Sequence, residues 1–271
     1  MTRTIRIRPN VTLAIVFSIL FQMVISGQVR AQWVEPNKDY LISYPQDVGY
    51  FFHQFTEWEG KQWVTAGGLI VVGGIILSQD QTLREFYIDN RTDVTNAISA
   101  NLAEPWGSGW YSGPFLAGLY LYGGLTRDLH HQKVALDGAK AFLIAGGGAM
   151  IIKNLFHRER PNEQEFPDPL QFHGPFMPLG KYESFVSGHT ATTFALATVL
   201  AYSYDDPWVG IVAYGFAGLT GWSRLHDDVH WSSDVYFGAL FGYLVGRAVV
   251  KNDSKWNITP LPNGVSLRVA L

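Results

Sequence analysis

Charged and polar residues form three short clusters at the edges of apolar stretches between residues 153 and 234. The clusters are Lys153 with Arg160-Pro161, Ser187-Gly188-His189, and Ser223-Arg224 with His230 and Asp234. Together they supply cations that suit phosphate oxygens, two imidazoles and one carboxylate. An imidazole can attack phosphorus or give a proton to a leaving oxygen. These residue types therefore predict a phosphate pocket equipped for phosphoryl transfer through a phosphohistidine.

The first cluster contains two cations, Lys153 and Arg160, which are seven residues apart. Seven residues are about two helical turns, so a helix running through both would present them on nearly one face. Pro161 would end that helix. The alternative is that the two cations lie in solvent at a helix end. We expect the intervening residues 157–159 to face solvent or to form ion pairs.

The second cluster, Ser187-Gly188-His189, stands directly before an apolar run. Ser187 is a suitable N-cap, and the exposed N–H groups of a helix start bind anions. Gly188 would allow close approach of the backbone. His189 would then lie beside a bound phosphate as a general acid. The alternative is a helix cap with an unrelated histidine nearby.

In the third cluster Arg224 lies at the end of the fifth apolar stretch, and His230 and Asp234 are four residues apart, as on one helical face. Asp234 would orient one ring nitrogen of His230 and leave the other free as a nucleophile. The alternative is a structural His–Asp pair. The run His226-Asp227-Asp228 could add metal ligands to His230, but a nucleophile needs a free nitrogen and consecutive acids in a loop are commonly solvated. We therefore predict no metal and no cofactor.

Six apolar stretches without strict alternation predict six helices and an all-α fold. They are Val64–Ser78, Gly113–Leu125, Ala141–Ile152, Thr190–Tyr204, Pro207–Trp222 and Val235–Gly246. Polar residues 79–81 should close the first helix, and a tight turn at 205–207 should separate the fourth from the fifth. The helix number and paired glycines favour a membrane, whereas most uncharged cores are shorter than the roughly 20 residues of a span. A soluble helical bundle is therefore the alternative to a membrane-embedded one.

The two ends of the chain differ from the bundle. Residues 1–31 resemble a secretory signal, with arginines before an uncharged run, although a retained anchor is the alternative. Residues 32–60 lack a helical period and are expected to be extended, before a helical domain at 61–252. Asn263-Gly264 between two partly alternating runs predicts a β-hairpin within the tail 253–271.

Composition limits the functional classes. Removal of residues 1–31 deletes four arginines and no acid, so the formal charge changes from −3 to −7. Such a protein is a poor candidate for binding nucleic acid. The chain has no Cys, which excludes disulfides and thiolate chemistry. We expect an exported protein, either in the membrane with a periplasmic-facing site or soluble in the periplasm, and the sequence leaves its oligomeric state open.

The three clusters together resemble the signature of the type 2 phosphatidic acid phosphatase (PAP2) superfamily, which also contains bacterial acid phosphatases and vanadium haloperoxidases. The resemblance implies that Lys153, Arg160 and Arg224 bind phosphate, with backbone help at 187–188. It also implies that His189 is the general acid. His230 would be the nucleophile and Asp234 its partner.

One departure from that signature is Val186, where the family usually has Pro. This change should relax the start of the following helix without removing a charged group. The implied activity is metal-independent hydrolysis of lipid phosphates, other phosphomonoesters or pyrophosphates. The alternatives are a vanadium-dependent haloperoxidase and a non-catalytic membrane or anion-binding protein.

Overall fold

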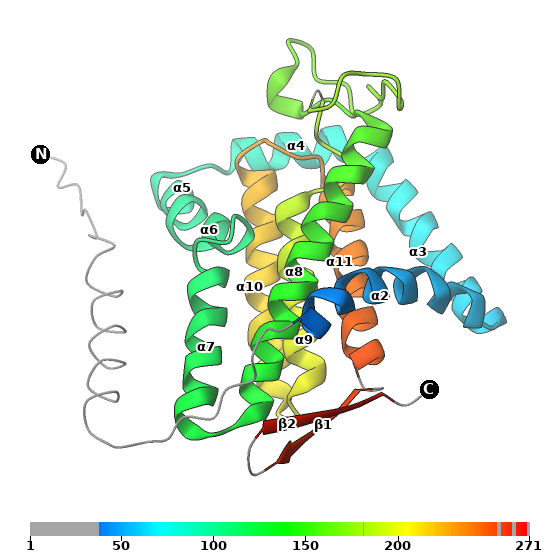
Figure 1. Cartoon of the computed structure of the whole chain (residues 1–271). Coiled ribbons are helices and arrows are strands. Elements are labelled where there is room, and N and C mark those ends of the chain that lie inside the picture. The colour runs from blue at the N-terminus through cyan, green and yellow to red at the C-terminus, as the bar shows by residue number, and fades with distance from the viewer. Residues whose placement is uncertain (1–37, 181, 254–255, 262–263, 270–271) are drawn as a thin grey trace, which may run out of the picture.

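The computed structural model describes residues 38–180, 182–253, 256–261 and 264–269, which form a helical bundle followed by two strands (Figure 1). The longer helices are α2 (Lys38–His53), α3 (Gly60–Ser78), α4 (Asp80–Asp89), α7 (Ser112–Thr126), α8 (Leu129–Phe156), α9 (Gly188–Ser203), α10 (Pro207–His226) and α11 (Ser232–Asp253). The short ones are η1 (Gln54–Glu57), α5 (Asp93–Ile98), η2 (Ser99–Ala103), α6 (Glu104–Gly107) and η3 (Pro161–Glu163).

Helix α9 is the centre of the bundle, because α8, α10 and α11 all pack against it. Its residues Ala191, Ala195 and Val199 are fully buried in the main apolar core. Helix α7 packs on α8, while α2 and α3 pack on α11. The connections from α8 to α9 and from α10 to α11 lie at the same end of the bundle as α4, α5 and α6 (Figure 1). The helix ends that carry the predicted site therefore meet at one end.

All six predicted apolar stretches are helical, so the helical class is confirmed, but the expected number of six is wrong. The break expected at residues 79–81 is only a turn, and α4 begins at Asp80. Two more short helices, α5 and α6, lie between α4 and α7. Their sequences, of six and four residues, are too short to show a helical period, so they depend on packing against the bundle.

The segment expected to be extended, residues 32–60, instead contains helix α2 and η1 within its described part. Helix α2 contains Pro45, which disfavours a helix locally. Tertiary contacts outweigh that effect. Asp47 pairs with Lys140 of α8 at 2.7 Å, with both side chains almost completely buried, and Tyr40 donates to the carbonyl of Leu136 at 2.9 Å.

Two strands follow α11 and lie at the end of the bundle opposite α4 (Figure 1). Strand β1 (Trp256–Leu261) pairs antiparallel with β2 (Gly264–Val269), with Leu261 opposite Gly264. The connecting residues 262 and 263, which include the Asn of the expected turn, lie outside the described residues. The expected signal, residues 1–31, also lies outside them.

Glycines on α11 set its distance from α9. A Cβ at Gly242 would collide with the carbonyl oxygen of Ala191, and one at Gly246 would lie 2.5 Å from the carbonyl oxygen of Ala195. Small residues at a spacing of four let two helix backbones approach closely. This contact brings the start of α11 beside the start of α9.

Two described helices are long and apolar enough to cross a membrane, α3 and α8. Most of α3 is uncovered by the rest of the bundle, and its Val64, Ile70 and Ile75 are each at least 60% exposed. Large exposed apolar surfaces mark sites of contact with a membrane or a partner.

We predict that Gly242→Ala destabilises the protein by roughly 1–3 kcal/mol, because the added methyl must displace backbone of α9. Thermal or denaturant unfolding of the purified protein, followed by circular dichroism, measures the change. The control is Gly147→Ala on α8, where no atom lies within 4 Å of the added carbon. That variant should be neutral or more stable by up to about 1 kcal/mol. Equal effects of the two changes would contradict this account of the α9–α11 contact.

Candidate active site

Most of the predicted residues lie at the ends of four helices that meet at one end of the bundle, whereas Arg160 and His230 lie in the connections after α8 and α10. His230 therefore does not share a helix with Asp234, contrary to the expectation from their spacing. Lys153 lies in the last turn of α8, and Arg224 lies in the last turn of α10. Ser187 is the N-cap of α9, and Asp234 lies in the first turn of α11. Cations are favoured at helix C-termini and anions at N-termini. The fold thus places these cations together with the free N–H groups at the start of a helix.

The start of α9 has the form predicted for an anion site. The Oγ of Ser187 accepts from the N–H of Thr190, and the N–H of Ser187 donates to the carbonyl of Asp234 at 3.0 Å. The latter bond ties α9 to α11. Val186, the departure from the family signature, is 3% exposed and belongs to the apolar core. The segment before the helix is therefore anchored without Pro.

Lys153 and Arg160 do not share a helix, contrary to the prediction from their spacing. Helix α8 ends at Phe156, and Arg160 has an extended backbone with φ −77° and ψ 148°. A residue before Pro is disfavoured in the helical conformation, which accounts for this geometry. The charges of both cations nevertheless contribute to lowering the pKa of His230, so both act on the same imidazole.

His230 is a buried imidazole with a carboxylate at its side. Its Nδ1 lies 3.6 Å from the Oδ2 of Asp234, which is an ion-pair distance rather than a hydrogen bond, and its side chain is 3% exposed. Burial lowers the pKa of His230 to about 3, and the charges of Lys153 and Arg160 add to the effect, while Asp234 opposes it. The ring is therefore neutral at ordinary pH, as a nitrogen nucleophile requires.

Asp234 is held by several donors. Its Oδ1 accepts from Nη1 of Arg158, and its Oδ2 accepts from Ser184 Oγ at 2.5 Å and from the N–H of Trp231 at 2.9 Å. Burial alone would raise the pKa of Asp234, but Arg158, His230 and Ser184 together keep it below its usual value. The carboxylate is fixed in one orientation and stays ionised.

Arg158 is a functional candidate that the sequence analysis did not single out. It lies in the span where we expected solvent or ion pairing, and it is both ion-paired and completely buried. Its Nη2 donates to Asp80 Oδ2 at 2.7 Å, and its Nη1 donates to Asp234 and to Ser233 Oγ. The guanidinium therefore joins α4 to the start of α11.

Asp80 completes this buried cluster. It was expected only to break a helix, but it is fully buried and accepts from both N–H and Oγ of Ser233, at 2.8 and 2.5 Å. The other residues of the 157–159 span also have partners. Glu159 pairs with His173 at 2.6 Å, and the ring of buried His157 contacts the carbonyl of Gly174 at 2.9 Å.

His189 has a carboxylate partner that the sequence analysis did not identify. Its Nε2 lies 3.0 Å from Oε1 of Glu104, the first residue of α6, and about a third of each side chain is exposed. Glu104 is an isolated acid before an uncharged run, so no motif marks it. Burial lowers the pKa of His189, with a further contribution from Arg224, whereas Glu104 opposes the change.

The run 226–228 makes separate contacts with different parts of the protein. His226 contacts Asn96, Asp227 accepts from Arg224 at 2.9 Å, and Asp228 pairs with Arg84 at 2.7 Å. Within the described ranges, no group of three or more His, Cys, Asp or Glu side chains is arranged to hold a metal ion. Asp227 thus orients the phosphate-ligand candidate Arg224.

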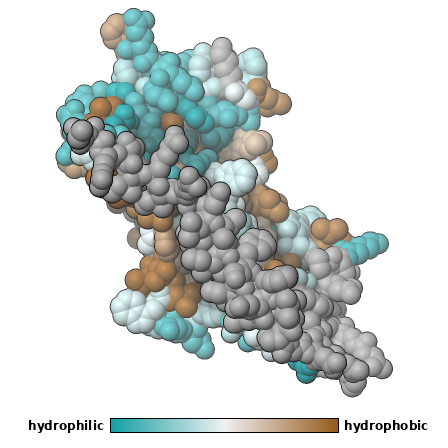
Figure 2. Space-filling view, turned by 90° about the vertical axis from the view of Figure 1, so that its left-hand side faces the viewer, coloured by the Kyte–Doolittle hydropathy of each residue, from teal (hydrophilic) through white to brown (hydrophobic). Residues whose placement is uncertain are grey.

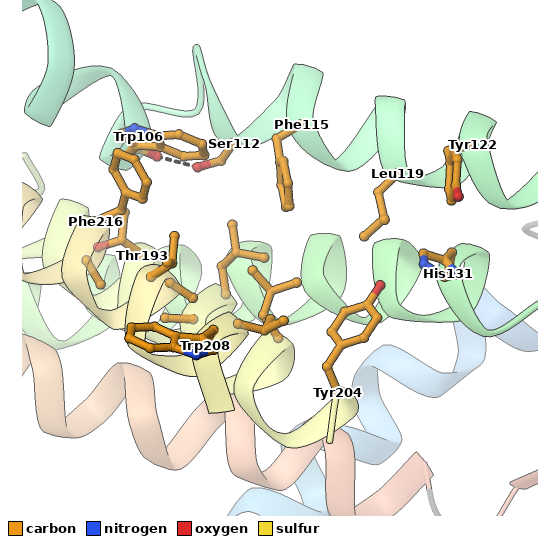
Figure 3. A pocket seen from close by; sticks show the side chains of 17 residues that line it. Trp106, Ser112, Phe115, Leu119, Tyr122, His131, Thr193, Tyr204, Trp208 and Phe216 are labelled. Carbon is orange, nitrogen blue, oxygen red and sulfur yellow. Dashed lines mark hydrogen bonds between the residues drawn. The ribbon is translucent and has the colours of Figure 1, made fainter. Parts of the chain in front are cut away.

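An apolar pocket of about 520 Å³ runs beside α9, between α7 and α10 (Figure 3). Phe115, Leu119, Leu200 and Phe216 are among its lining residues, and Tyr122, His131 and Tyr204 lie toward one end of it. At the other end are Trp106, two residues after Glu104, and Thr193, whose hydroxyl donates to the carbonyl of His189 at 2.9 Å. The pocket therefore reaches the neighbourhood of the predicted general acid.

Comparisons with known proteins agree with the family resemblance. Residues 137–258 match the sequence model of the PAP2 superfamily. Lipid A 1-phosphatase of Porphyromonas gingivalis is 49% identical over 66 residues, which are 24% of this chain and 15% of that relative. The match thus spans a small part of the curated relative. The crystal structure of Aquifex aeolicus LpxE aligns with a TM-score of 0.51 and 23% identity, covering 64% of this chain and 94% of that one.

We predict that Arg158→Met lowers the free energy of unfolding by about 3–5 kcal/mol, because it leaves two buried carboxylates without their cation. Denaturant unfolding measures the loss. The double variant Asp80→Asn, Arg158→Met should be more stable than Arg158→Met alone, since it removes one unpaired charge. A double variant no more stable than the single one would contradict the pairing of Asp80 with Arg158.

Proposed function

We propose that the protein is a phosphatase of the PAP2 superfamily, whose sequence model matches residues 137–258, and that it acts on lipid phosphates. One observation carries the proposal: Lys153 and Asp234 both lie against the start of α9, which carries His189. A Cβ at Gly188 would lie 3.9 Å from Cε of Lys153, and the N–H of Ser187 donates to the carbonyl of Asp234 at 3.0 Å. Because Oδ2 of Asp234 lies 3.6 Å from Nδ1 of His230, we infer that the two imidazoles border one cationic pocket. Arg160 also acts on Arg224, which adds the third cation to the same place.

The proposed reaction has two steps. The phosphate is held by Lys153, Arg160 and Arg224 and by the N–H groups at the start of α9. The free nitrogen of His230 attacks phosphorus, the bond to the ester oxygen breaks, and His189 gives that oxygen a proton. Water then attacks the phosphohistidine and loses a proton to His189, which releases inorganic phosphate.

The environments of the two histidines suit these roles. His230 is neutral because it is buried among cations, so its lone pair is available. The positive charge that forms on its ring during attack faces the ionised Asp234. This arrangement lowers the barrier by stabilising charge that develops in the transition state. The scheme needs no metal ion.

A lipid substrate is supported by the exposed apolar helices and by the distribution of polar surface. Helices α3 and α8 have the length and composition of membrane spans. Figure 2 shows hydrophilic residues gathered at the upper end of the visible face, with hydrophobic residues exposed below it. The helix ends that carry the predicted residues lie at that end of the bundle (Figure 1). We propose that it lies at headgroup level, on the exported face that the signal-like residues 1–31 favour.

The apolar pocket supports the same substrate class, because it offers a place for a hydrocarbon chain whose phosphate lies near His189. Its lining is almost entirely aliphatic and aromatic (Figure 3). Each buried methylene contributes about 0.8 kcal/mol. Chain contacts in the pocket would therefore favour long-chain lipid phosphates over water-soluble esters.

We predict that His230→Ala reduces phosphate release from an aryl phosphate on the order of 10³-fold or more, because it removes the attacking nitrogen. A phosphate assay on the purified variant, with circular dichroism to verify folding, measures this. His53→Ala, on the exposed part of α2, is the matched control and should retain activity. A folded His230→Ala enzyme with substantial turnover would refute the assignment of the nucleophile.

We predict that Ala213→Trp, which fills part of the pocket, lowers kcat/KM for a long-chain phosphatidic acid relative to a dibutyryl analogue by about tenfold. Loss of two buried methylenes accounts for that factor. The control is Ala117→Trp, on an exposed position of α7 that does not line the pocket. It should leave the ratio of the two kcat/KM values unchanged. If Ala213→Trp leaves the ratio of the two kcat/KM values unchanged, the hydrocarbon chain of the substrate does not bind in this pocket.

A further inference from the structure

Glu104 is an acid at the edge of a strongly cationic site. Its Oε1 lies 3.0 Å from Nε2 of His189. The positive charges of Lys153 and Arg224 lower the pKa of the same imidazole, whereas Glu104 raises it. Such an exposed ion pair contributes little to stability. Its main effect is therefore on the orientation and protonation of His189.

The backbone around Glu104 is held by hydrogen bonds from two helices, which restricts the position of its carboxylate. Thr192 of α9 donates to the carbonyl of Gly107 at 3.2 Å, and Thr220 of α10 donates to the carbonyl of Ala103 at 2.9 Å. Gly107 lies directly against the ring of His189, where a Cβ would come within 2.8 Å of Cδ2. Short helix α6 is thus clamped between α9 and α10 next to the imidazole.

The charges that face His189 come from three elements. Arg224 of α10 and Lys153 of α8 add to burial in lowering its pKa, and Glu104 of α6 opposes them. A bound phosphate would lie among the same cations. Without the carboxylate, the imidazolium form that a general acid needs would be opposed by burial and by the charges of Arg224 and Lys153.

We propose that Glu104 is a positioning residue, which binds Nε2 of His189 and thereby directs Nδ1, with its proton, to the leaving oxygen of the substrate. This inference rests on the proposed phosphatase activity and adds a residue to it. In the first step the Nδ1–H bond breaks and the proton joins the departing alkoxide. In the second step Nδ1 takes a proton from the attacking water. Nε2 keeps its own proton, shared with Glu104, throughout.

The test uses Glu104→Gln and two substrates whose leaving groups differ in their need for a proton. An alkyl phosphate releases a basic alkoxide, whereas 4-nitrophenyl phosphate releases a weakly basic phenolate. A general acid contributes about 10²–10⁴-fold, so we expect kcat/KM of the variant to fall at least about tenfold for the alkyl ester and much less for the nitrophenyl ester. Loss of an equal factor for both substrates would overturn the proposal.

The pH profile gives a second readout that a structural role would not change. A general acid loses its proton as pH rises through its pKa, so a lower pKa moves the alkaline limb of kcat/KM to lower pH. Glu104→Gln should shift that limb downwards, and the ionisation of the substrate itself is the same for both enzymes. Glu165→Gln, in an exposed loop, is the control and should leave the limb in place. An unshifted limb in Glu104→Gln would also overturn the proposal.

Two further measurements separate this inference from the proposed function. In a His189→Ala background, Glu104→Gln should cause no additional loss, and an additional loss would show that Glu104 does not act through His189. An NMR titration of the His189 ring should show a lower pKa in Glu104→Gln than in the unchanged protein. That titration needs no turnover, so it tests the role of Glu104 even if the wild-type protein releases no phosphate. Absence of phosphate release from the wild-type protein would refute only the phosphatase proposal.

Discussion

The site depends on one buried cation, the guanidinium of Arg158. It holds Asp234 of α11 and Asp80 of α4, and these three charges are shielded from water. Removing ions from water costs several kcal/mol each, and their mutual attraction offsets this only when the geometry is good and the remaining polar atoms are satisfied. Ser233, Ser184 and the carbonyl of Pro169 satisfy them here. That cluster fixes the orientation of Asp234, and Asp234 in turn lies beside the ring of His230.

Helix direction supplies the second requirement. Antiparallel neighbours in a bundle present alternating C- and N-termini at each end, so cations at the ends of α8 and α10 stand beside the free N–H groups at the start of α9. Both arrangements are favourable for the helix dipoles by themselves. Glycines of α11 complete the geometry, because close contact with α9 brings Asp234 beside Ser187. In the proposed function, a phosphate would lie between these cations and the N–H groups.

The sequence predicted the parts of the molecule that local patterns encode. The six apolar stretches became helices, and the cap at Ser187 follows from its position before an apolar run. The roles of Arg158 and Glu104 were not predictable in this way. Arg158 meets Asp80 across 78 residues and Glu104 meets His189 across 85, so no periodicity relates them. Helix α2 was missed for the same reason, since its buried contacts with α8 outweigh an interior Pro.

The two carboxylates beside the histidines differ in what they can still do. Asp234 already accepts hydrogen bonds from Arg158, Ser184 and the backbone of Trp231. Its negative charge is therefore largely compensated and does little to raise the pKa of His230. In the proposed reaction, Asp234 would orient the ring and stabilise the charge that attack creates. Glu104 is more exposed, and its Oε1 is directed at His189. Burial lowers the pKa of both imidazoles, but at His189 the carboxylate of Glu104 opposes that change. The two rings therefore differ in environment, as two histidines with separate roles in proton transfer and attack require.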